Sequence, residues 1–439
     1  MTAMSPPRNA ILALTLFVLT NLACAKSVPL SEPAPTAIPG TSAPLNDSID
    51  NVDFCFDGNE HLHLVWTVSE HGRQSIEARY QRLDMRTGTW AYPSVLGKCE
   101  PGPIRIVDAS SGLNVIASRD LHHWVSPDSG QTWLSKGDLG GDSRRSITGF
   151  DATADKGELL VTYIASLRQA YQPRSESKVV IGTVRDSGLR SELTVFQGSH
   201  ARPICPRLLL KGDSLLLVYA VSSNTGADTG TKSRILMLRS GDDGMTWSQP
   251  REVWPIGDAA RFPFIEQLDA TIVEGTIVVF YRAGVLFSLR STGPTSWTSP
   301  VRVAVPPPSP STRSYQAYSP SCASNGHGGR VAWIDTRFTR SEQTAVNPLG
   351  GIPWSDQPEW ANNDVFSLPL RPYAEIADGS VPAAPPIRHT PDLSQASSVR
   401  TAIHGNSAYV IWAGRAKVGR SARDAGEVPQ LFYVTISVE

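Results

Sequence analysis

The sequence has no basic run, no excess of either charge and, after its N-terminal segment, no long apolar run. Its 439 residues include 40 Lys and Arg and 41 Asp and Glu, which leaves a formal net charge of −1. This balance gives no electrostatic reason to expect nucleic acid as a partner. No apolar stretch beyond residue 25 is long enough to span a bilayer.

Several enzyme signatures are absent as well. The chain has no P-loop, no dinucleotide-binding glycine motif, no serine nucleophile elbow and no H-E-x-x-H metal motif. Its cysteines do not form the C-x-x-C pairs of a zinc site. We therefore expect no metal and no cofactor.

Turn-forming residues are plentiful instead. The chain contains 35 Gly and 34 Pro, only 18% of its residues are charged, and it has few helical runs. This composition is typical of an all-β protein rich in turns.

Residues 1–25 have the pattern of a signal peptide. Arg8 supplies a positive region and Ile11–Leu19 an apolar core. Two processing sites remain open: an A-x-A cleavage site at 23–25, and a lipobox at 21–24 that would make Cys24 the lipidated first residue. The lipobox is favoured because residues 26–50 are dense in Pro, Ser, Thr and Ala. They resemble a flexible tether for a membrane-anchored domain at 51–439.

Both processing sites predict export, to the cell envelope or outside the cell. Four cysteines, Cys55, Cys99, Cys205 and Cys322, would then lie in an oxidising compartment. An even number allows three disulfide pairings. Buried free thiols are the equally open alternative.

One eight-residue phrase, S-x-D-x-G-x-T-W, occurs twice, at residues 126–133 and 240–247. The Asp, Ser and Thr side chains can bond the backbone of a tight turn, and Gly supplies a positive φ. The Trp begins the next strand, so we expect Trp133 and Trp247 to be largely buried at equivalent places. The phrase predicts a turn between two antiparallel strands.

A unit of several strands recurs about every 40 to 55 residues, which is the spacing of a β-propeller. We count seven units. The seventh stops after its third strand, so we expect a strand from the N-terminal side to complete the ring.

The repeated phrase resembles the Asp-box of the sialidase-type β-propellers. The resemblance implies an all-β ring of four-stranded antiparallel blades. The seven units predict seven blades, and six is the alternative because classical sialidases have six. In such a meander the box turns share one face with the turns between first and second strands. The longer loops lie on the other face, where ligands are expected.

The resemblance extends to candidate catalytic residues. Glu266 opens a strand and Arg282 ends the next one, as in a sialidase segment, and Ala317-Tyr318-Ser319 is similar to the sequence around the family's tyrosine nucleophile. The resemblance implies that Tyr318 is the nucleophile, that Glu266 assists it, and that Arg282 holds the carboxylate of a sialic acid. A tyrosine needs such a base, because its hydroxyl is a poor nucleophile near pH 7.

Other residues of the same face complete the predicted site. Asp335 is the candidate acid, and arginine forks suit a substrate carboxylate. A loop at 338–361 offers apolar platforms for a sugar ring. The remaining predicted substrate-binding residues are Arg202, Arg261, Arg337, Trp354 and Trp360.

The sequence also departs from the sialidase pattern. The Phe/Tyr-Arg-Ile-Pro motif of the first blade is missing, and its nearest counterpart, at 202–204, comes far too late.

The functional hypothesis from the resemblance is an exported, monomeric exo-glycosidase that acts on acidic sugars. The alternative is a non-catalytic propeller that binds glycan or protein at the cell envelope.

Overall fold

The chain folds into strands and turns in this computed structural model. It describes residues 34–44, 47–70, 76–117, 120–139, 145–167, 176–185, 188–198, 201–223, 232–255, 265–283, 285–303, 317–335, 363–370, 386–390, 394–418 and 426–438. All of these except Ala34 belong to one compact unit, Pro35–Glu439. Across these ranges, no helix has the length and hydrophobicity needed to traverse a membrane.

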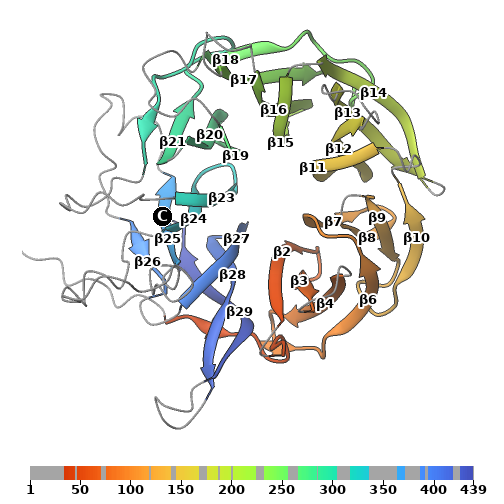
Figure 1. Ribbon diagram of the computed structural model, residues 1–439, viewed down its shortest axis with the longest axis vertical. Helices are drawn as coiled ribbons and strands as arrows, with labels where there is room; N and C mark the ends of the chain where they lie inside the picture. The colour runs from red at the N-terminus through yellow and green to blue at the C-terminus, as the bar shows by residue number, and fades with distance from the viewer. Residues whose placement is uncertain are drawn as a thin grey trace, which may run out of the picture. The chain divides into compact units, whose positions relative to one another are not determined.

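Seven antiparallel sheets follow one another in chain order around a ring, so this unit is a seven-bladed β-propeller (Figure 1). The predicted seven-bladed fold is confirmed, and the six-bladed alternative is excluded. In each blade consecutive strands pair, with the first strand innermost.

The first three blades have the following strands. Blade 1 contains β2 (Ser48–Phe56), β3 (His61–Ser69), β4 (Ile76–Asp84), β5 (Thr89–Trp90) and β6 (Ser94–Cys99). Blade 2 contains β7 (Ile104–Ala109), β8 (Gly112–Ala117), β9 (His122–Ser126) and β10 (Leu134–Asp138). Blade 3 contains β11 (Arg145–Asp155), β12 (Glu158–Leu167), β13 (Glu176–Arg185) and β14 (Gly188–Gly198). Among the described residues, blade 1 alone has a fifth strand, because β5 and β6 both pair with β4.

The next three blades repeat the meander. Blade 4 contains β15 (Ala201–Lys211), β16 (Ser214–Ser223), β17 (Lys232–Ser240) and β18 (Arg251–Pro255). Blade 5 contains β19 (Gln267–Val273), β20 (Thr276–Ala283), β21 (Val285–Arg290) and β22 (Val301–Arg302). Blade 6 contains β23 (Ala317–Ser324), β24 (Gly329–Asp335), β25 (Asp364–Leu370) and β26 (Ile387–Arg388).

Blade 7 joins both ends of the propeller chain. Its strands are β27 (Ser394–His404), β28 (Ser407–Val418), β29 (Gly426–Ser437) and the N-terminal β1 (Thr36–Ala37). β1 pairs antiparallel with β29, as expected for an N-terminal strand that closes the ring.

The expected domain boundary at residue 51 is too late. β1 and the buried side chains of Ile38, Thr41 and Ala43 lie inside the segment predicted to be a tether. Its composition is dominated by Pro, Ser and Thr, but two or three apolar residues are enough to fill an edge position against β29.

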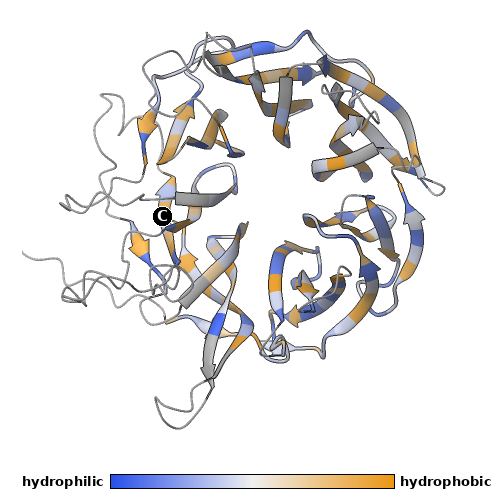
Figure 2. Ribbon diagram, viewed as in Figure 1, coloured by the Kyte–Doolittle hydropathy of each residue, from blue (hydrophilic) through white to orange (hydrophobic). Residues whose placement is uncertain are grey.

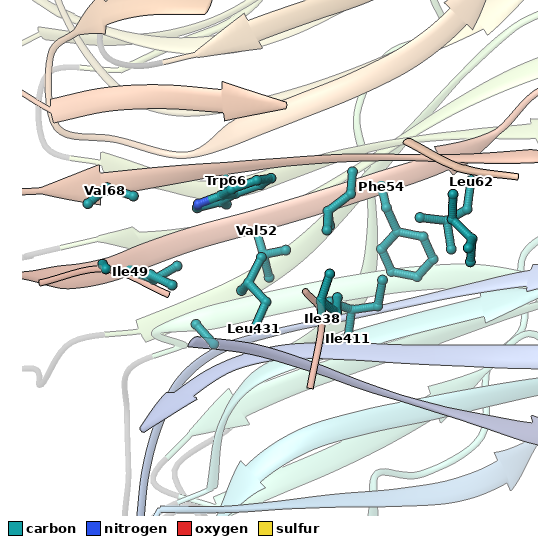
Figure 3. Packing of buried hydrophobic residues seen from close by; sticks show 13 residues of the cluster. Ile38, Ile49, Val52, Phe54, Leu62, Trp66, Val68, Ile411 and Leu431 are labelled. Atoms are coloured by element: carbon teal, nitrogen blue, oxygen red, sulfur yellow. The ribbon is translucent and has the colours of Figure 1, made fainter. Parts of the chain in front are cut away.

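The core consists of seven hydrophobic clusters, one between each pair of successive blades. The second strand of a blade is covered on both sides, so it is apolar along most of its length. In β24, for example, every residue is buried. Apolar stretches recur on strands around the ring (Figure 2). The cluster between blades 7 and 1 includes Ile38 from the N-terminal segment and Ile411 and Leu431 from blade 7 (Figure 3).

Two faces of the propeller follow from the strand order. The turns between first and second strands lie on the same face as the Asp-boxes, as predicted, and we call this the box face. Lys156 in the β11–β12 turn forms an ion pair with Asp243 in the box of the next blade, which places both turns together. The opposite end of the strands is the loop face, and Arg282 lies there at the end of β20.

The two complete Asp-boxes have the same internal hydrogen bonds. In the first box, Asp128 Oδ1 accepts from the Thr132 amide at 2.8 Å and Oδ2 from the Thr132 hydroxyl at 2.6 Å. In the second, Asp242 makes the corresponding bonds to Thr246 at 2.9 Å and 2.6 Å. These bonds, the one to the Thr132 hydroxyl first, lower the pKa of Asp128 to about 2.

Each box tryptophan packs against the preceding blade, and both are largely though not completely buried at equivalent places, as expected. Trp133 of blade 2 contacts Tyr80 of blade 1, with ring centroids 4.8 Å apart. Trp247 of blade 4 packs against the cluster between blades 3 and 4. The ring begins the outermost part of a blade, so one side of it stays in solvent.

Cys55, Cys99, Cys205 and Cys322 are free thiols. The sequence left disulfides and free thiols open for these four residues, and the structure has free thiols.

Candidate functional site

Glu266 and Arg282 form an ion pair on the loop face of blade 5. Glu266 Oε2 lies 2.7 Å from a guanidinium nitrogen of Arg282. The backbone amide of Glu266 also donates to the Arg282 carbonyl at 3.0 Å, so the two residues face each other across the start of the blade. The side chain of Glu266 is 47% exposed and that of Arg282 16%. A solvent-facing carboxylate over a mostly buried cation is therefore available to a ligand.

The backbone around Tyr318 lies beside this pair. In β23, the first strand of blade 6, the Ser319 amide donates to the side-chain oxygen of Gln267 at 2.6 Å. Gln267 directly follows Glu266, so this bond joins the two predicted catalytic positions of adjacent blades. The side chain of Tyr318 is outside the described part of the chain, and its distance to Glu266 stays a prediction.

A β-bulge follows Tyr318. The pairing of β23 with β24 shifts register between Tyr318 and Ser321, and Ser319 has a φ of 52°. Bulges redirect neighbouring side chains, and a non-glycine residue in the left-handed region costs energy that the surroundings must supply. A similar shift occurs in β15, with Cys205 at a φ of 45°, so the feature is shared between blades.

Asp335 occupies the end of β24, level with Ala317 of β23. Its side chain is fully buried, and its Oδ2 accepts a hydrogen bond from the Trp333 indole at 3.0 Å. A general acid must reach its substrate, so Asp335 would need to be exposed by a movement of its surroundings. Its role as the acid stays a prediction.

Asp364 lies opposite Asp335 at the start of β25 and was not foreseen from the sequence. It bonds the Thr390 hydroxyl at 2.9 Å and lies 2.7 Å from the Arg388 guanidinium. Burial raises the pKa of Asp364, and the nearby negative charge of Asp335 raises it further. Arg388 and Thr390 act in the opposite direction and lower it. Two carboxyl groups thus lie side by side near the loop face of blade 6.

The remaining predicted residues lie outside the described part of the chain. This applies to Arg261, Arg337, Trp354, Trp360 and the lipidation candidate Cys24, and to the side chain of Arg202. Their roles in ligand binding and anchoring stay predictions.

A ring of seven residues, six of them charged, surrounds the propeller axis, with one residue from each innermost strand. In chain order the positions are Asp53, Arg105, Asp151, Arg207, Asp269, Cys322 and Arg400. We call this set the charged ring. Its three acids and three arginines balance exactly in formal charge, and all six charged side chains are at least four-fifths buried.

Ion pairs link the charged ring around the axis. Arg105 Nε lies 2.9 Å from Asp151, Arg207 Nε lies 2.6 Å from Asp269, and another Arg207 nitrogen is 3.5 Å from Asp151. Burial lowers the pKa of Arg207, but Asp269 and Asp151 outweigh it and raise the pKa overall. The Arg207 guanidinium therefore stays charged.

Each aspartate of the charged ring also accepts a hydrogen bond from a backbone amide of the next blade. Asp53 accepts from the Ile106 amide at 2.9 Å, Asp151 from the Leu208 amide at 3.0 Å, and Asp269 from the Cys322 amide at 2.9 Å. Each carboxylate thus joins a cation to a backbone amide of the following blade.

Sequence analysis missed the charged ring, although a signal was present. Six of the seven innermost strands contain a charged residue at this level, as Asp151 in GFDATAD and Arg400 in SVRTAIH. Aligning the seven repeats on their first strands would have placed these residues in one column.

No protein-family model matches the chain, and no curated protein matches it. Among solved structures, a Penicillium chrysogenum α-L-arabinanase complexed with arabinobiose is 15% identical, with 69% of this chain and 94% of that chain covered and a TM-score of 0.46. The polysaccharide lyase Uly1 is 9% identical over 95% of both chains, with a TM-score of 0.49. A protein of unknown function from Dyadobacter fermentans is 12% identical over 92% of this chain and all of that one, with a TM-score of 0.46. At such identities the likeness is one of fold, and the propeller assignment itself rests on the sheet order.

Proposed function

We propose that the propeller acts on glycans at its loop face, as an exo-glycosidase for terminal acidic sugars. The observation that carries the proposal is the Glu266–Arg282 ion pair of 2.7 Å beside the backbone of Tyr318. In this mechanism Glu266 accepts the proton of the Tyr318 hydroxyl, and the phenolate attacks the anomeric carbon of the sugar. The glycosidic bond breaks as this bond forms, the leaving oxygen takes a proton from water, and a second water then hydrolyses the glycosyl–tyrosine bond and restores the Tyr318 hydroxyl.

Arg282 has two functions in this proposal. Its positive charge favours an anionic sugar, and it holds the carboxylate of Glu266 in place. Glu266 has lone pairs beyond the one used by Arg282, so it can accept from the tyrosine at the same time.

The test is hydrolysis of a fluorogenic sialoside by the full chain. Tyr318→Phe removes only a hydroxyl, and we expect it to lower kcat by about a thousandfold or more without loss of folding. Glu266→Gln should also be severely impaired, because an amide cannot accept the proton. Tyr92→Phe is the matched control, since Tyr92 is 96% exposed on blade 1.

A non-catalytic glycan-binding propeller is the second candidate. The complete burial of Asp335 favours it, because the predicted acid faces Trp333 and not solvent. A glycan array would then give binding that Arg282→Ala weakens, with no hydrolysis. Absence of both hydrolysis and glycan binding would contradict both candidates.

A further inference from the structure

A cluster of two histidines and one carboxylate lies on blade 1, at the box face. Asp57 is in the turn after β2, and His61 and His63 are on β3. One donor atom from each of the three side chains falls within 4.8 Å of the others. The cluster is at the opposite face from Glu266 and Arg282, so it is independent of the proposed glycosidase site.

The backbone of the turn and of β3 brings the donor atoms of the three side chains close together. His61 and His63 are two residues apart on a strand, so their side chains lie on the same side of it. The Oδ1 atom of Asp57 accepts the amides of Asn59 at 2.8 Å and His61 at 2.9 Å. These bonds fix the carboxylate and leave its Oδ2 atom facing the imidazoles.

The distances match those between neighbouring ligands of a metal ion. Asp57 Oδ2 lies 3.0 Å from His61 Nδ1 and 3.1 Å from His63 Nε2. Ligand atoms that are each about 2.1 Å from one ion lie roughly 3.0–3.4 Å apart in octahedral or tetrahedral geometry.

The Nε2 atom of His63 is available to coordinate a metal ion. Its ring is fully buried, and Nδ1 shares a hydrogen bond of 2.8 Å with the Tyr80 hydroxyl. Nε2 forms no hydrogen bond of acceptable geometry, although it is close to Asp57. Metal-binding histidines commonly have their other nitrogen held in this way.

We propose that Asp57, His61 and His63 bind a divalent transition metal of the Zn²⁺ class. Two imidazoles and one carboxylate suit such ions better than Ca²⁺ or Mg²⁺, which prefer oxygen ligands. The side chain of His61 is 21% exposed, so water can complete the coordination. The ion would join the turn after β2 to β3.

This departs from the expectation of a chain without metal. That expectation considered cysteine pairs and the H-E-x-x-H motif only. A D-x-x-x-H-x-H pattern across a β-turn has a different spacing, because alternate strand residues share one side.

The test uses tag-free full-length protein, stripped with a chelator and titrated with Zn²⁺ by calorimetry. We expect one equivalent to bind and the unfolding temperature to rise. We expect His61→Ala and Asp57→Asn each to weaken binding by at least tenfold. Co²⁺ in place of Zn²⁺ should give visible absorption bands that His61→Ala removes.

His122→Ala is the matched control. His122 pairs with Asp138 at 2.6 Å on blade 2, but within the described part of the chain these two residues belong to no three-ligand cluster. Zn²⁺ affinity should be unchanged in this variant. The proposal is overturned if wild-type protein binds no equivalent of Zn²⁺ or Co²⁺, if His61→Ala binds as tightly as wild type, or if His122→Ala loses the site.

Discussion

The side chains of the charged ring differ in how completely they are neutralised. Arg207 lies between two aspartates, whereas the described neighbours of Arg400 include one carboxylate, Asp53, at 3.4 Å. Burial first, and Arg105 second, lower the pKa of Arg400 to about 10. Acid and base cannot alternate fully around an odd number of blades, and Cys322 occupies the odd place between Asp269 and Arg400.

This difference predicts unequal effects of two matched substitutions. Arg207→Met should reduce the free energy of unfolding by about 3–5 kcal/mol, because it leaves Asp269 buried without its cation. Arg400→Met should reduce the free energy of unfolding by clearly less, because it also removes the large desolvation penalty of the buried Arg400 guanidinium. Urea unfolding followed by tryptophan fluorescence measures both. An equal or larger loss for Arg400→Met would contradict this account of the ring.

The Asp-box turns show how one local motif is adapted to different neighbours. Gly130 and Gly244 occupy the same place in their boxes, and both have a φ of 85°. A Cβ atom on Gly244 would meet Leu215 at 3.4 Å, an ordinary contact, whereas one on Gly130 would lie 1.8 Å from the Tyr80 hydroxyl. Tyr80 cannot easily withdraw, because it packs against Trp133 and bonds His63.

The two glycines therefore predict different costs for the same substitution. Gly244→Ala should destabilise the protein by about 1–2 kcal/mol, the cost of an alanine in the left-handed region. Gly130→Ala should cost more, because the same strain is joined by a collision with Tyr80. The midpoint of urea unfolding separates the two contributions. Equal losses would mean that Tyr80 moves without cost.

Turns and strands could be predicted from the sequence because their causes are local. The Asp-box bonds join residues no more than four apart, and second strands such as β16 (SLLLVYAVSS) are apolar because they are covered on both sides. Asp364 could not, because its place beside Asp335 depends on how β24 and β25 pair, and the shared level of the charged ring appears only when all seven repeats are aligned. A bulge such as the one between Ile204 and Arg207 shifts that level by a residue or more.

The candidate site was predictable only in part for the same reason. Glu266 and Arg282 come together because they lie at the two ends of a single hairpin. The burial of Asp335 depends on packing against Trp333 in the completed blade, and no feature of the segment WIDTR indicates it.

At the scale of the propeller, ring closure combines hydrogen bonds with burial. β1 pairs with β29, and Ile38 is completely buried between blades 7 and 1. The Ile38 amide donates to the Leu431 carbonyl at 2.9 Å, and the Leu431 amide donates to the Thr41 hydroxyl at 3.1 Å. Without these residues β29 would become an exposed edge strand.

Removal of the closing segment should therefore destabilise the whole ring. A variant without residues 1–43 loses β1, Ile38 and Thr41, and its free energy of unfolding should fall by about 3 kcal/mol or more, since burial of one isoleucine contributes roughly 1.5–3 kcal/mol. The matched control lacks only residues 1–34 and keeps every one of these contacts. Thermal unfolding compares the two, and light scattering should detect self-association of the shorter variant through β29. If both variants unfold at the same temperature, the contacts between blades hold the ring closed without its N-terminal strand.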